Sequence, residues 1–222
     1  MSDDQFPDLT WREKVPIATR FDDPYFSLED GLAETEYVFL GGNNLPDRFH
    51  DGFHVAELGF GTGLNFLVTW QAWRRAGVSG VLHFTSFELF PMKEADMLRA
   101  LSGFPALGDL SRDMVDGLAG GYRFEGEDVE LDIVVGDARE TVRDWDRCAN
   151  AWYLDGFAPA RNPELWESEL LREVARHTKR GGSAATYSAA GFIRRSLQEA
   201  GFEVERRPGF GRKRHMTVAH KL

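Results

Sequence analysis

Three glycines at alternate positions, Gly59, Gly61 and Gly63, separate an apolar run that ends at Leu58 from a second apolar run that begins at Leu64. Glycine adopts backbone angles that other residues avoid, and it leaves room for a ligand where a Cβ would collide. A strand, such a turn and a helix together aim free backbone N–H groups at that ligand. The pattern predicts a nucleotide-type binding turn; the alternative is a tight strand–helix turn without a ligand.

The spacing of the turn indicates which ligand class it suits. A dinucleotide turn has the form Gly-x-Gly-x-x-Gly with an acid about 20 residues later, but Leu64 occupies the place of its third glycine. An acid, Glu57, precedes the first glycine by two residues. This spacing is similar to the first motif of class I S-adenosylmethionine-dependent methyltransferases. The expected cofactor-binding residues here are Glu57, Gly59, Gly61, Thr62, Gly63 and Asn65.

Two further acids follow predicted strands. Glu88 ends the strand at 81–88, where a carboxylate is placed to accept hydrogen bonds from both ribose hydroxyls of an adenosine. Asp137 follows the strand at 129–135 and is expected to accept from the adenine amine, while the Ala138 N–H donates to a ring nitrogen. The alternatives are an exposed acid that caps a helix beginning near Pro91, for Glu88, and a helix N-cap, for Asp137. The N-cap role is compatible with the cofactor role.

Asp155 comes directly after an apolar strand at 151–154. In doubly wound sheets, ligands bind beyond the carboxyl ends of the strands, at the switch in strand order. We therefore expect Asp155 to face the reactive end of the cofactor and to be catalytic. Asp-Gly is also an ordinary turn pair, but Phe157 and Pro159 crowd the same loop and suggest a shaped pocket. Amino-directed methyltransferases often carry Asp or Asn, two prolines and an aromatic residue here, so the analogy is partial.

The elements that must position these residues alternate between strands and helices. After residue 50 we expect strands at 53–58, 81–88, 129–135, 151–154, 183–187, 202–206 and 213–220. Helices are expected at 64–75, 163–177 and 191–200, and 91–128 is helical and then loop-like. A hairpin at 208–211 makes the last strand antiparallel. The predicted fold is α/β, a class I methyltransferase with a seven-stranded Rossmann-like sheet at 51–222. A strand-rich extension at 1–50, with a strand at 36–40, covers one edge.

Composition narrows the class of protein. The chain has 222 residues, 42% of them hydrophobic and 13% aromatic, enough for one α/β domain with an extension. No run approaches the roughly 18 apolar residues of a membrane span. The single cysteine, Cys148, fits a reducing cytosol and is expected to be a small packed or edge residue. The six histidines show no metal-ligand spacing, so no metal is expected.

Charge is distributed unevenly along the chain. The net charge of −10 argues mildly against a nucleic-acid partner, because phosphate binding usually leaves a basic footprint. Residues 191–222, however, hold eight basic and three acidic side chains. A basic C-terminal face on an acidic body is compatible with local RNA binding. A solvated charge run on an edge strand explains the same pattern equally well.

Five stretches of the chain share their sequence with one family. They are FDDPYFS at 21–27, GLAETEYVFLGGNNLPDRF at 31–49, ELGFGTGLNFL at 57–67, DGFAPARNPELW at 155–166 and AAGFIRRSLQEAGFEVERRPGFGRKRHM at 189–216. The sequence resembles the methyltransferase domain of the bifunctional bacterial tRNA 5-methylaminomethyl-2-thiouridine biosynthesis protein and its stand-alone counterparts. The likeness covers most of the chain except 91–130. The flavin-dependent domain of the fused proteins is absent, so we expect a stand-alone enzyme or an excised domain without flavin.

The resemblance implies a reaction and its partners. A methyl group passes from S-adenosylmethionine to the primary amine of 5-aminomethyl-(2-thio)uridine at the wobble position of tRNA, in the cytoplasm. The expected partners are the tRNA anticodon loop and either a separate oxidoreductase or the enzymes that install the aminomethyl precursor. The residues expected to meet the substrate, by stacking on the base or holding phosphates, are Tyr25, Phe26, Phe157, Pro159, Tyr187, Arg194, Arg195, Arg212, Lys213 and Arg214.

Other functions stay open at this point. A small-molecule amine methyltransferase, or an aminopropyltransferase-like enzyme, would keep the glycine turn and Glu88, and the acidic net charge favours cationic substrates. A non-catalytic S-adenosylmethionine-binding module would bind cofactor and transfer nothing, although an intact Asp155 counts against it. A nicotinamide oxidoreductase ranks last because of Leu64. Dependence of turnover on tRNA rather than on free amines separates the first two classes.

Overall fold

A computed structural model describes residues 6–27 and 30–222. Its centre is an eight-stranded sheet in the order β10-β11-β9-β8-β4-β5-β7-β6. The strands are β4 (His54–Leu58), β5 (Leu82–Glu88), β6 (Arg123–Glu125), β7 (Val129–Val135), β8 (Ala149–Leu154), β9 (Thr178–Thr186), β10 (Phe202–Pro208) and β11 (His215–Lys221). Strands β7, β5, β4, β8 and β9 run parallel, whereas β11 is antiparallel to both β9 and β10. This confirms the predicted fold class.

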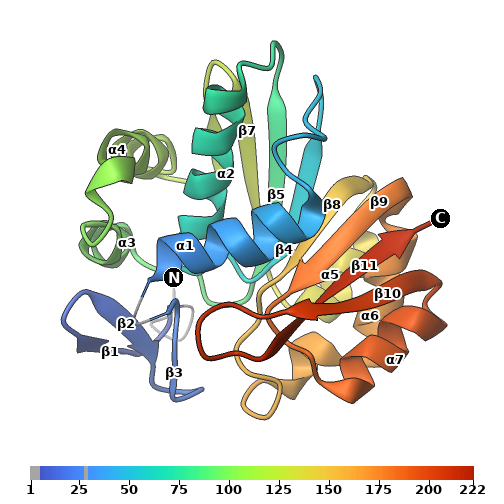
Figure 1. Cartoon of the computed structure of the whole chain (residues 1–222). Coiled ribbons are helices and arrows are strands. Elements are labelled where there is room, and N and C mark those ends of the chain that lie inside the picture. Colours follow the sequence, from blue (N-terminus) through green and yellow to red (C-terminus); the bar gives the residue numbers. More distant parts are fainter. Residues whose placement is uncertain (1–5, 28–29) are drawn as a thin grey trace.

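Helices cover both faces of the sheet (Figure 1). On one face lie α1 (Gly31–Thr35), α2 (Leu64–Ala76), α3 (Glu94–Leu101) and α4 (Gly108–Gly117). On the other lie α5 (Ala138–Asp144), α6 (Ser168–Arg176) and α7 (Gly191–Glu199). Neighbouring strand residues point to opposite layers: Val55 and Tyr153 join the α2 side, and Ala56 and Trp152 join the α6 side. Strand β4 is buried at all five positions, and its two polar residues, His54 and Glu57, form side-chain hydrogen bonds inside the protein.

The N-terminal part contains both strands and a long helical segment. Strands β1 (Leu9–Arg12), β2 (Val15–Ala18) and β3 (Asp23–Pro24) form a separate antiparallel sheet. The predicted strand at 36–40 is wrong: these residues form the π turn η2 (Glu36–Leu40), which continues α1 and leads into the 3₁₀ turn η3 (Gly41–Asn43). The four apolar residues that follow Glu36 fit a buried helix as well as a strand. The helix is decided upstream, where Asp30 caps it by accepting from the Ala33 N–H at 3.0 Å.

Three other expectations need correction. The segment at 91–128 contains an eighth strand, β6, which pairs antiparallel with β7 at the sheet edge, so the sheet is not seven-stranded. The predicted helix at 163–177 is divided into a 3₁₀ turn, η5 (Pro163–Trp166), and α6. Strand β9 begins at Thr178, not at 183, and β11 begins at His215, not at 213. A further 3₁₀ turn, η4 (Pro105–Leu107), joins α3 to α4. The division of the chain at residue 50 stays a proposal.

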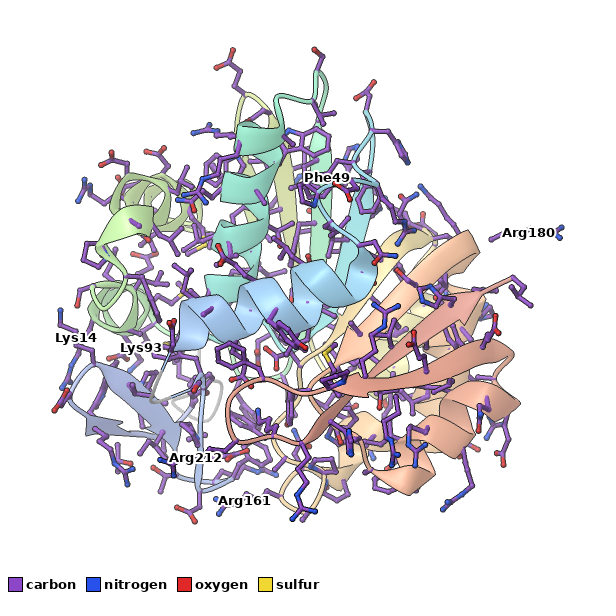
Figure 2. All side chains as sticks on the ribbon, in the orientation of Figure 1. Lys14, Phe49, Lys93, Arg161, Arg180 and Arg212 are labelled. Carbon is purple, nitrogen blue, oxygen red and sulfur yellow. The ribbon has the colours of Figure 1, made fainter. Side chains whose placement is uncertain are left out.

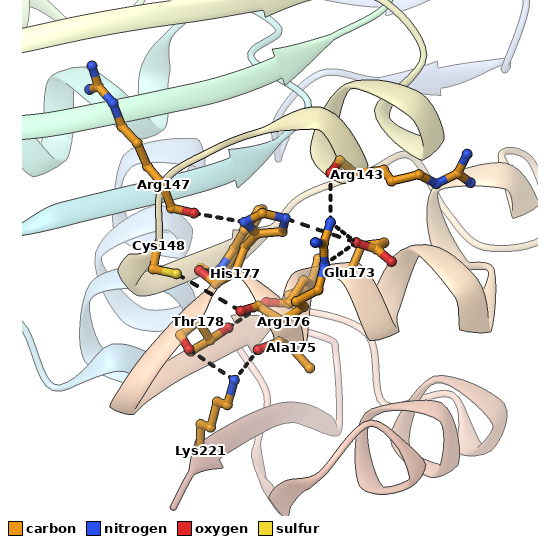
Figure 3. Close-up of polar contacts among 11 residues, drawn as sticks. Arg143, Arg147, Cys148, Glu173, Ala175, Arg176, His177, Thr178 and Lys221 are labelled. Atoms are coloured by element: carbon orange, nitrogen blue, oxygen red, sulfur yellow. Dashed lines mark hydrogen bonds and ion pairs between the residues drawn. The ribbon is translucent and has the colours of Figure 1, made fainter.

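At the start of β8 and β9, several side chains form hydrogen bonds with backbone carbonyl groups (Figure 3). Lys221 donates to the carbonyls of Ala175 and Thr178, the latter at 3.0 Å. Arg176 donates to the Arg143 carbonyl at 2.6 Å, and His177 Nδ1 lies 2.8 Å from the Arg147 carbonyl. The exposed Cys148 thiol lies at the same place. This cluster is at the amino ends of the two strands and therefore away from the site at their carboxyl ends.

No helix in the described part of the chain is long and apolar enough to cross a membrane.

Candidate active site

A cavity of about 1060 Å³ lies beyond the carboxyl ends of β4, β5, β7 and β8, where the strand order reverses between β4 and β8. The N-terminal sheet, α1 and the loop between β10 and β11 complete its wall. Fourteen of the sequence-predicted residues line it: Tyr25, Phe26, Gly59, Gly61, Thr62, Asn65, Glu88, Asp137, Ala138, Asp155, Phe157, Tyr187, Arg212 and Lys213. The topology thus brings together residues that are up to 188 positions apart in sequence.

The glycine turn needs its glycines for two reasons. Gly59, Gly61 and Gly63 all have positive φ, a region that residues with a Cβ rarely adopt. Space is equally restrictive: a Cβ on Gly59 would lie 2.9 Å from the Asp155 carbonyl oxygen, and one on Gly61 would lie 2.9 Å from the Tyr25 ring. The turn is therefore packed directly against Asp155 on one side and against the Tyr25 ring on the other. Gly63 precedes α2 as its N-cap and contacts the interior, not the cavity.

Glu88 holds the glycine turn and faces the cavity. Its Oε2 accepts from the Gly61 N–H at 3.0 Å, and its Oε1 accepts from the Phe90 N–H at 2.8 Å. Burial raises the pKa of Glu88, and these backbone N–H groups act against that rise. A carboxylate has about four lone-pair positions, so both oxygens can still accept a hydroxyl. The position suits the ribose role that the sequence predicts.

Asp137 is the N-cap of α5, the helix that begins directly after it. It accepts from the Arg139 N–H at 2.9 Å and so caps α5, as expected. The Arg139 guanidinium also clamps it, with Nη2 at 2.6 Å from Oδ2. These hydrogen bonds lower the pKa of Asp137 and keep it ionised. Arg139 itself lines the cavity and bridges to Glu167 at 3.2 Å. An adenine amine at this end would therefore meet a carboxylate whose orientation is already fixed.

Asn65 connects the two acids nearest the reactive end. Its Nδ2 donates to Glu57 Oε1 at 2.8 Å and to Asp155 Oδ2 at 2.7 Å. The Thr35 hydroxyl donates to Asn65 Oδ1 at 2.8 Å, which fixes the amide with its NH₂ toward the acids. Glu57 is fully buried beneath the cavity and also accepts from the Ser86 hydroxyl at 2.7 Å. Glu57 therefore supports Asn65 from below and does not line the cavity.

The environment of Asp155 favours its protonated form more than water does. Burial raises the pKa of Asp155 to about 7. The charges of Glu34 and Asp23 push this pKa in the same direction. The Asn65 hydrogen bond and the charge of Lys213 oppose the rise. The carboxyl group is thus placed to take up or release a proton near neutral pH, as a general base or acid must.

Aromatic rings form the wall opposite the glycine turn. Phe157 stacks on Phe21 with centroids 4.8 Å apart, and it meets the edge of Tyr25 at 5.1 Å. Tyr187 donates its hydroxyl to the Gly156 carbonyl at 2.7 Å, which fixes the ring beside Asp155. Burial raises the pKa of both tyrosines, so both stay neutral phenols. Phe26 lines the cavity but packs on Phe104 at 5.1 Å.

Four of the expected substrate residues do not line the cavity. Pro159 lies in the loop after Phe157, and Arg194 and Arg195 lie on α7. The exposed Arg214 precedes β11. Arg161 and Arg212, by contrast, line the cavity and lie at the end of the molecule where the N-terminal sheet and the β10–β11 loop approach each other (Figure 2).

Sequence reasoning missed several residues that the fold brings to the site. They are Asp23, Glu34, Thr35, Arg139 and Arg161. Asp23 accepts from the Ala158 N–H at 2.8 Å, which fastens the N-terminal sheet to the loop that carries Phe157. The exposed Asp22 also lies 2.9 Å from Arg161. The helical spacing of Gly31, Thr35 and Phe39 was the available signal for Thr35. It was lost because 36–40 was predicted as a strand.

Among residues 6–27 and 30–222, no group of three or more His, Cys, Asp or Glu side chains is arranged to hold a metal ion. The expectation that the site needs neither metal nor flavin stays a prediction.

Comparisons with known proteins agree with this geometry. A family model described as S-adenosyl-L-methionine-dependent methyltransferase matches residues 106–222. Two curated relatives bear the name tRNA 5-methylaminomethyl-2-thiouridine biosynthesis bifunctional protein MnmC. The protein from Hahella chejuensis is 43% identical over 227 residues, and that from Marinobacter nauticus is 41% identical over 226 residues. These matches cover 96% and 95% of this chain but 36% of each relative, so the chain spans about a third of their length.

Two solved structures share the fold. MNMC2 from Aquifex aeolicus superposes with a TM-score of 0.79 at 23% identity, covering 98% of this chain and 71% of that one. The precorrin-6y C5,15-methyltransferase from Geobacter metallireducens has a TM-score of 0.53 at 14% identity, covering 100% and 97%. At these identities the likeness concerns the fold. The resemblance stated from the sequence is confirmed by the curated relatives.

Proposed function

We propose that this chain, which belongs to the S-adenosyl-L-methionine-dependent methyltransferase family, methylates the primary amine of 5-aminomethyl-(2-thio)uridine at the wobble position of tRNA. The product is 5-methylaminomethyl-(2-thio)uridine. The observation that carries the proposal is the pairing of Asp155 with Asn65 at 2.7 Å, between the glycine turn and the Phe157 wall. A proton-accepting carboxylate there suits an amine nucleophile.

The cavity fits the cofactor in size and chemistry. Ligand sites usually measure about 300–1000 Å³, and a cavity of about 1060 Å³ has room for a nucleoside beside the cofactor. Glu88 offers acceptors for ribose hydroxyls, the glycine turn offers close backbone approach, and Asp137 offers an acceptor at the end of β7. The acidic groups near Asp155 suit a positively charged sulfonium. When bound, S-adenosylmethionine supplies an electrophilic methyl group and a good leaving group.

Asp155 has two tasks in this account. An alkylamine is mostly protonated at neutral pH, as lysine is, and a protonated amine has no lone pair for attack. The amine therefore reacts as its neutral form, after it has released one proton to solvent. The Asp155 carboxylate accepts an N–H hydrogen bond from this neutral amine, which aims the nitrogen lone pair toward the methyl group. As the N–C bond forms and the S–C bond breaks, the nitrogen gains positive charge, and its excess proton passes to Asp155. Positioning supplies most of the rate enhancement in such an in-line transfer.

The remaining walls suit a flipped-out nucleotide. Phe157, Tyr25 and Tyr187 present rings on which an unstacked base can stack. Arg161, which lines the cavity, extends the set of phosphate contacts that the sequence suggests at Arg194, Arg195, Arg212, Lys213 and Arg214. The enzymes that install the aminomethyl group act before this step, because the amine is the methyl acceptor. They are the partners we infer, together with tRNA.

The test is transfer of labelled methyl from S-adenosylmethionine to three acceptors: tRNA carrying the aminomethyl wobble uridine, the same tRNA without that group, and free alkylamines. We expect label in the first acceptor alone, mapping to the wobble nucleoside. Label in free amines at a comparable rate would favour a small-molecule amine methyltransferase, which the acids Asp23, Glu34 and Asp155 around the site also suit. Cofactor binding without any label would favour the non-catalytic module.

A further inference from the structure

The loop between β10 and β11, residues 209–214, is a strap that is fastened to the helical segment across the cavity. Within the strap, Gly209 N–H donates to the Arg214 carbonyl at 3.1 Å and Lys213 N–H donates to the Phe210 carbonyl at 3.0 Å. Outside it, the Tyr37 hydroxyl donates to the Pro208 carbonyl at 3.2 Å, and the Tyr37 and Phe210 rings meet at 5.9 Å. The strap, drawn in red, therefore crosses toward α1 in a defined position (Figure 1).

Lys213 of the strap has two partners within the cavity wall. Its Nζ donates to Glu34 Oε1 at 2.7 Å and lies 4.0 Å from the centroid of the Tyr187 ring. Glu34 comes from α1, and its side chain is 15% exposed, against 45% for Lys213. An ammonium over a tyrosine ring with a half-buried carboxylate partner has two attractive contacts in one place. Lys213 is thus an inward-facing residue of the cavity wall.

The charged and titratable groups that face Asp155 come from several parts of the fold. Glu57 of β4 is linked to Asp155 by Asn65 of α2, which donates a hydrogen bond to each of them. Glu34 of α1 and Asp23 of β3 act on it as negative charges, Tyr187 follows β9, and Lys213 comes from the strap. Of these groups, Lys213 carries the positive charge. Its removal and the removal of Glu34 must therefore change the charge that Asp155 experiences in opposite directions.

We propose that Glu34 and Lys213 form a positioning pair that seats the strap over the cavity and places one positive and one negative charge on the cavity wall that carries Asp155. The inference rests on the proposed function for the catalytic meaning of this arrangement, but not for its physical basis. Lys213 favours the ionised carboxylate, which accepts the amine proton. Glu34 holds the ammonium in place and opposes part of its effect. The pair leaves Asp155 able to exchange a proton near neutral pH, where a base is most useful.

The direct test is a titration of the Asp155 carboxyl carbon by ¹³C NMR, in protein labelled at aspartate, with Asp155→Asn identifying the signal. No cofactor or tRNA is needed. We expect Lys213→Met to raise the titration midpoint and Glu34→Gln to lower it, each by about 0.5–1 pH unit. Lys213→Arg should restore the wild-type midpoint. Arg214→Met, which removes an exposed charge from the same strap, is the matched control and should change little.

Movement of the midpoint in the same direction in both variants, or in neither, would overturn the proposal, because a merely structural ion pair has no reason to produce opposite shifts. Thermal melts establish that each variant is folded. Where the wild-type protein methylates tRNA, the acidic limb of the pH–rate profile should move with the NMR midpoint. Where it does not, the proposed function fails while the titration still decides this inference.

Discussion

At the scale of single residues, Asn65 explains how two acids can share one small volume. Its NH₂ group donates one hydrogen to Glu57 and one to Asp155, and Thr35 prevents the amide from turning over. An unpaired buried carboxylate is costly, and a shared donor reduces that cost. Asp155 still remains a destabilising group when it is ionised, because burial raises its pKa.

This cost predicts how stability depends on pH. The pKa of Asp155 is about 7 in the folded protein, whereas its ordinary value, which we take for the unfolded chain, is 3.8. Below the lower value both states hold the proton; between the two values the unfolded chain releases it and the folded chain keeps it. Asp155 therefore lowers stability progressively as pH rises across this window. Asp155→Asn should gain stability relative to wild type by about 1–3 kcal/mol between about pH 5.5 and about pH 8.

Urea unfolding of both proteins across that range measures the difference. A difference that stays constant with pH would contradict the raised pKa. A stability difference that grows toward acidic pH would mean that folding lowers the pKa of Asp155.

Sequence alone predicted Asp155 and Glu88 because each follows an apolar strand, and carboxyl ends of parallel strands meet at one edge. It placed Lys213 among the substrate residues, and Lys213 does line the cavity. It did not predict the ion pair with Glu34, which lies 179 residues away in the sequence. Glu57 was expected at the cofactor, but its position within β4 points it beneath the cavity. The assignment of individual roles stays a proposal.

At the scale of elements, the strands were easier to predict than the segments between them. Strands β4, β5, β7 and β8 are largely buried, and their apolar residues recur often enough to identify them from the sequence. The strand β6 was missed because three residues with exposed Arg123 and Glu125 carry almost no periodic signal. The π turn η2 was missed because burial of three consecutive residues, Val38, Phe39 and Leu40, removes the helical pattern.

The end of α6 gives a prediction at this scale. Lys221 of β11 donates to the carbonyls of Ala175 and Thr178, at the C-terminus of the helix (Figure 3). A cation there satisfies groups that the helix leaves unpaired and interacts favourably with its dipole. Lys221→Met should lower the free energy of unfolding by about 1–3 kcal/mol. Chemical denaturation measures this loss, and isothermal titration with S-adenosylmethionine should show unchanged affinity. A weakened cofactor affinity without a loss of stability would contradict the account.

At the scale of the whole molecule, the N-terminal sheet completes a site that the central sheet begins. Asp23 accepts the Ala158 N–H, and Phe21 stacks on Phe157, so this sheet fixes the loop that follows Asp155. The N-terminal sheet therefore belongs to the site as much as the glycine turn does. The short strands β1 to β3 were foreseen as a strand-rich extension, but their docking depends on contacts more than 130 residues apart.

Adjacent acids supply a matched pair for testing this docking. Asp23→Ala leaves the Ala158 N–H without its partner inside the cavity wall, so methyl transfer should fall by about 5- to 100-fold. Asp22→Ala removes an ion pair whose carboxylate is 89% exposed, and such pairs contribute little. Its activity should stay within about twofold of wild type. Single-turnover rates at saturating cofactor measure both. Equal losses would contradict a specific role for Asp23.

We propose that cofactor binding and proton handling belong to different residues of one cavity. The most direct measurement compares Asp155→Ala with Glu88→Ala, recording both the Kd for S-adenosylmethionine and the rate of methyl transfer to aminomethyl-bearing tRNA. The account predicts that Asp155→Ala keeps Kd within about threefold while the rate falls by about 100-fold or more. It predicts that Glu88→Ala weakens binding by about 1–3 kcal/mol. Equal loss of binding and rate in Asp155→Ala would contradict the claim.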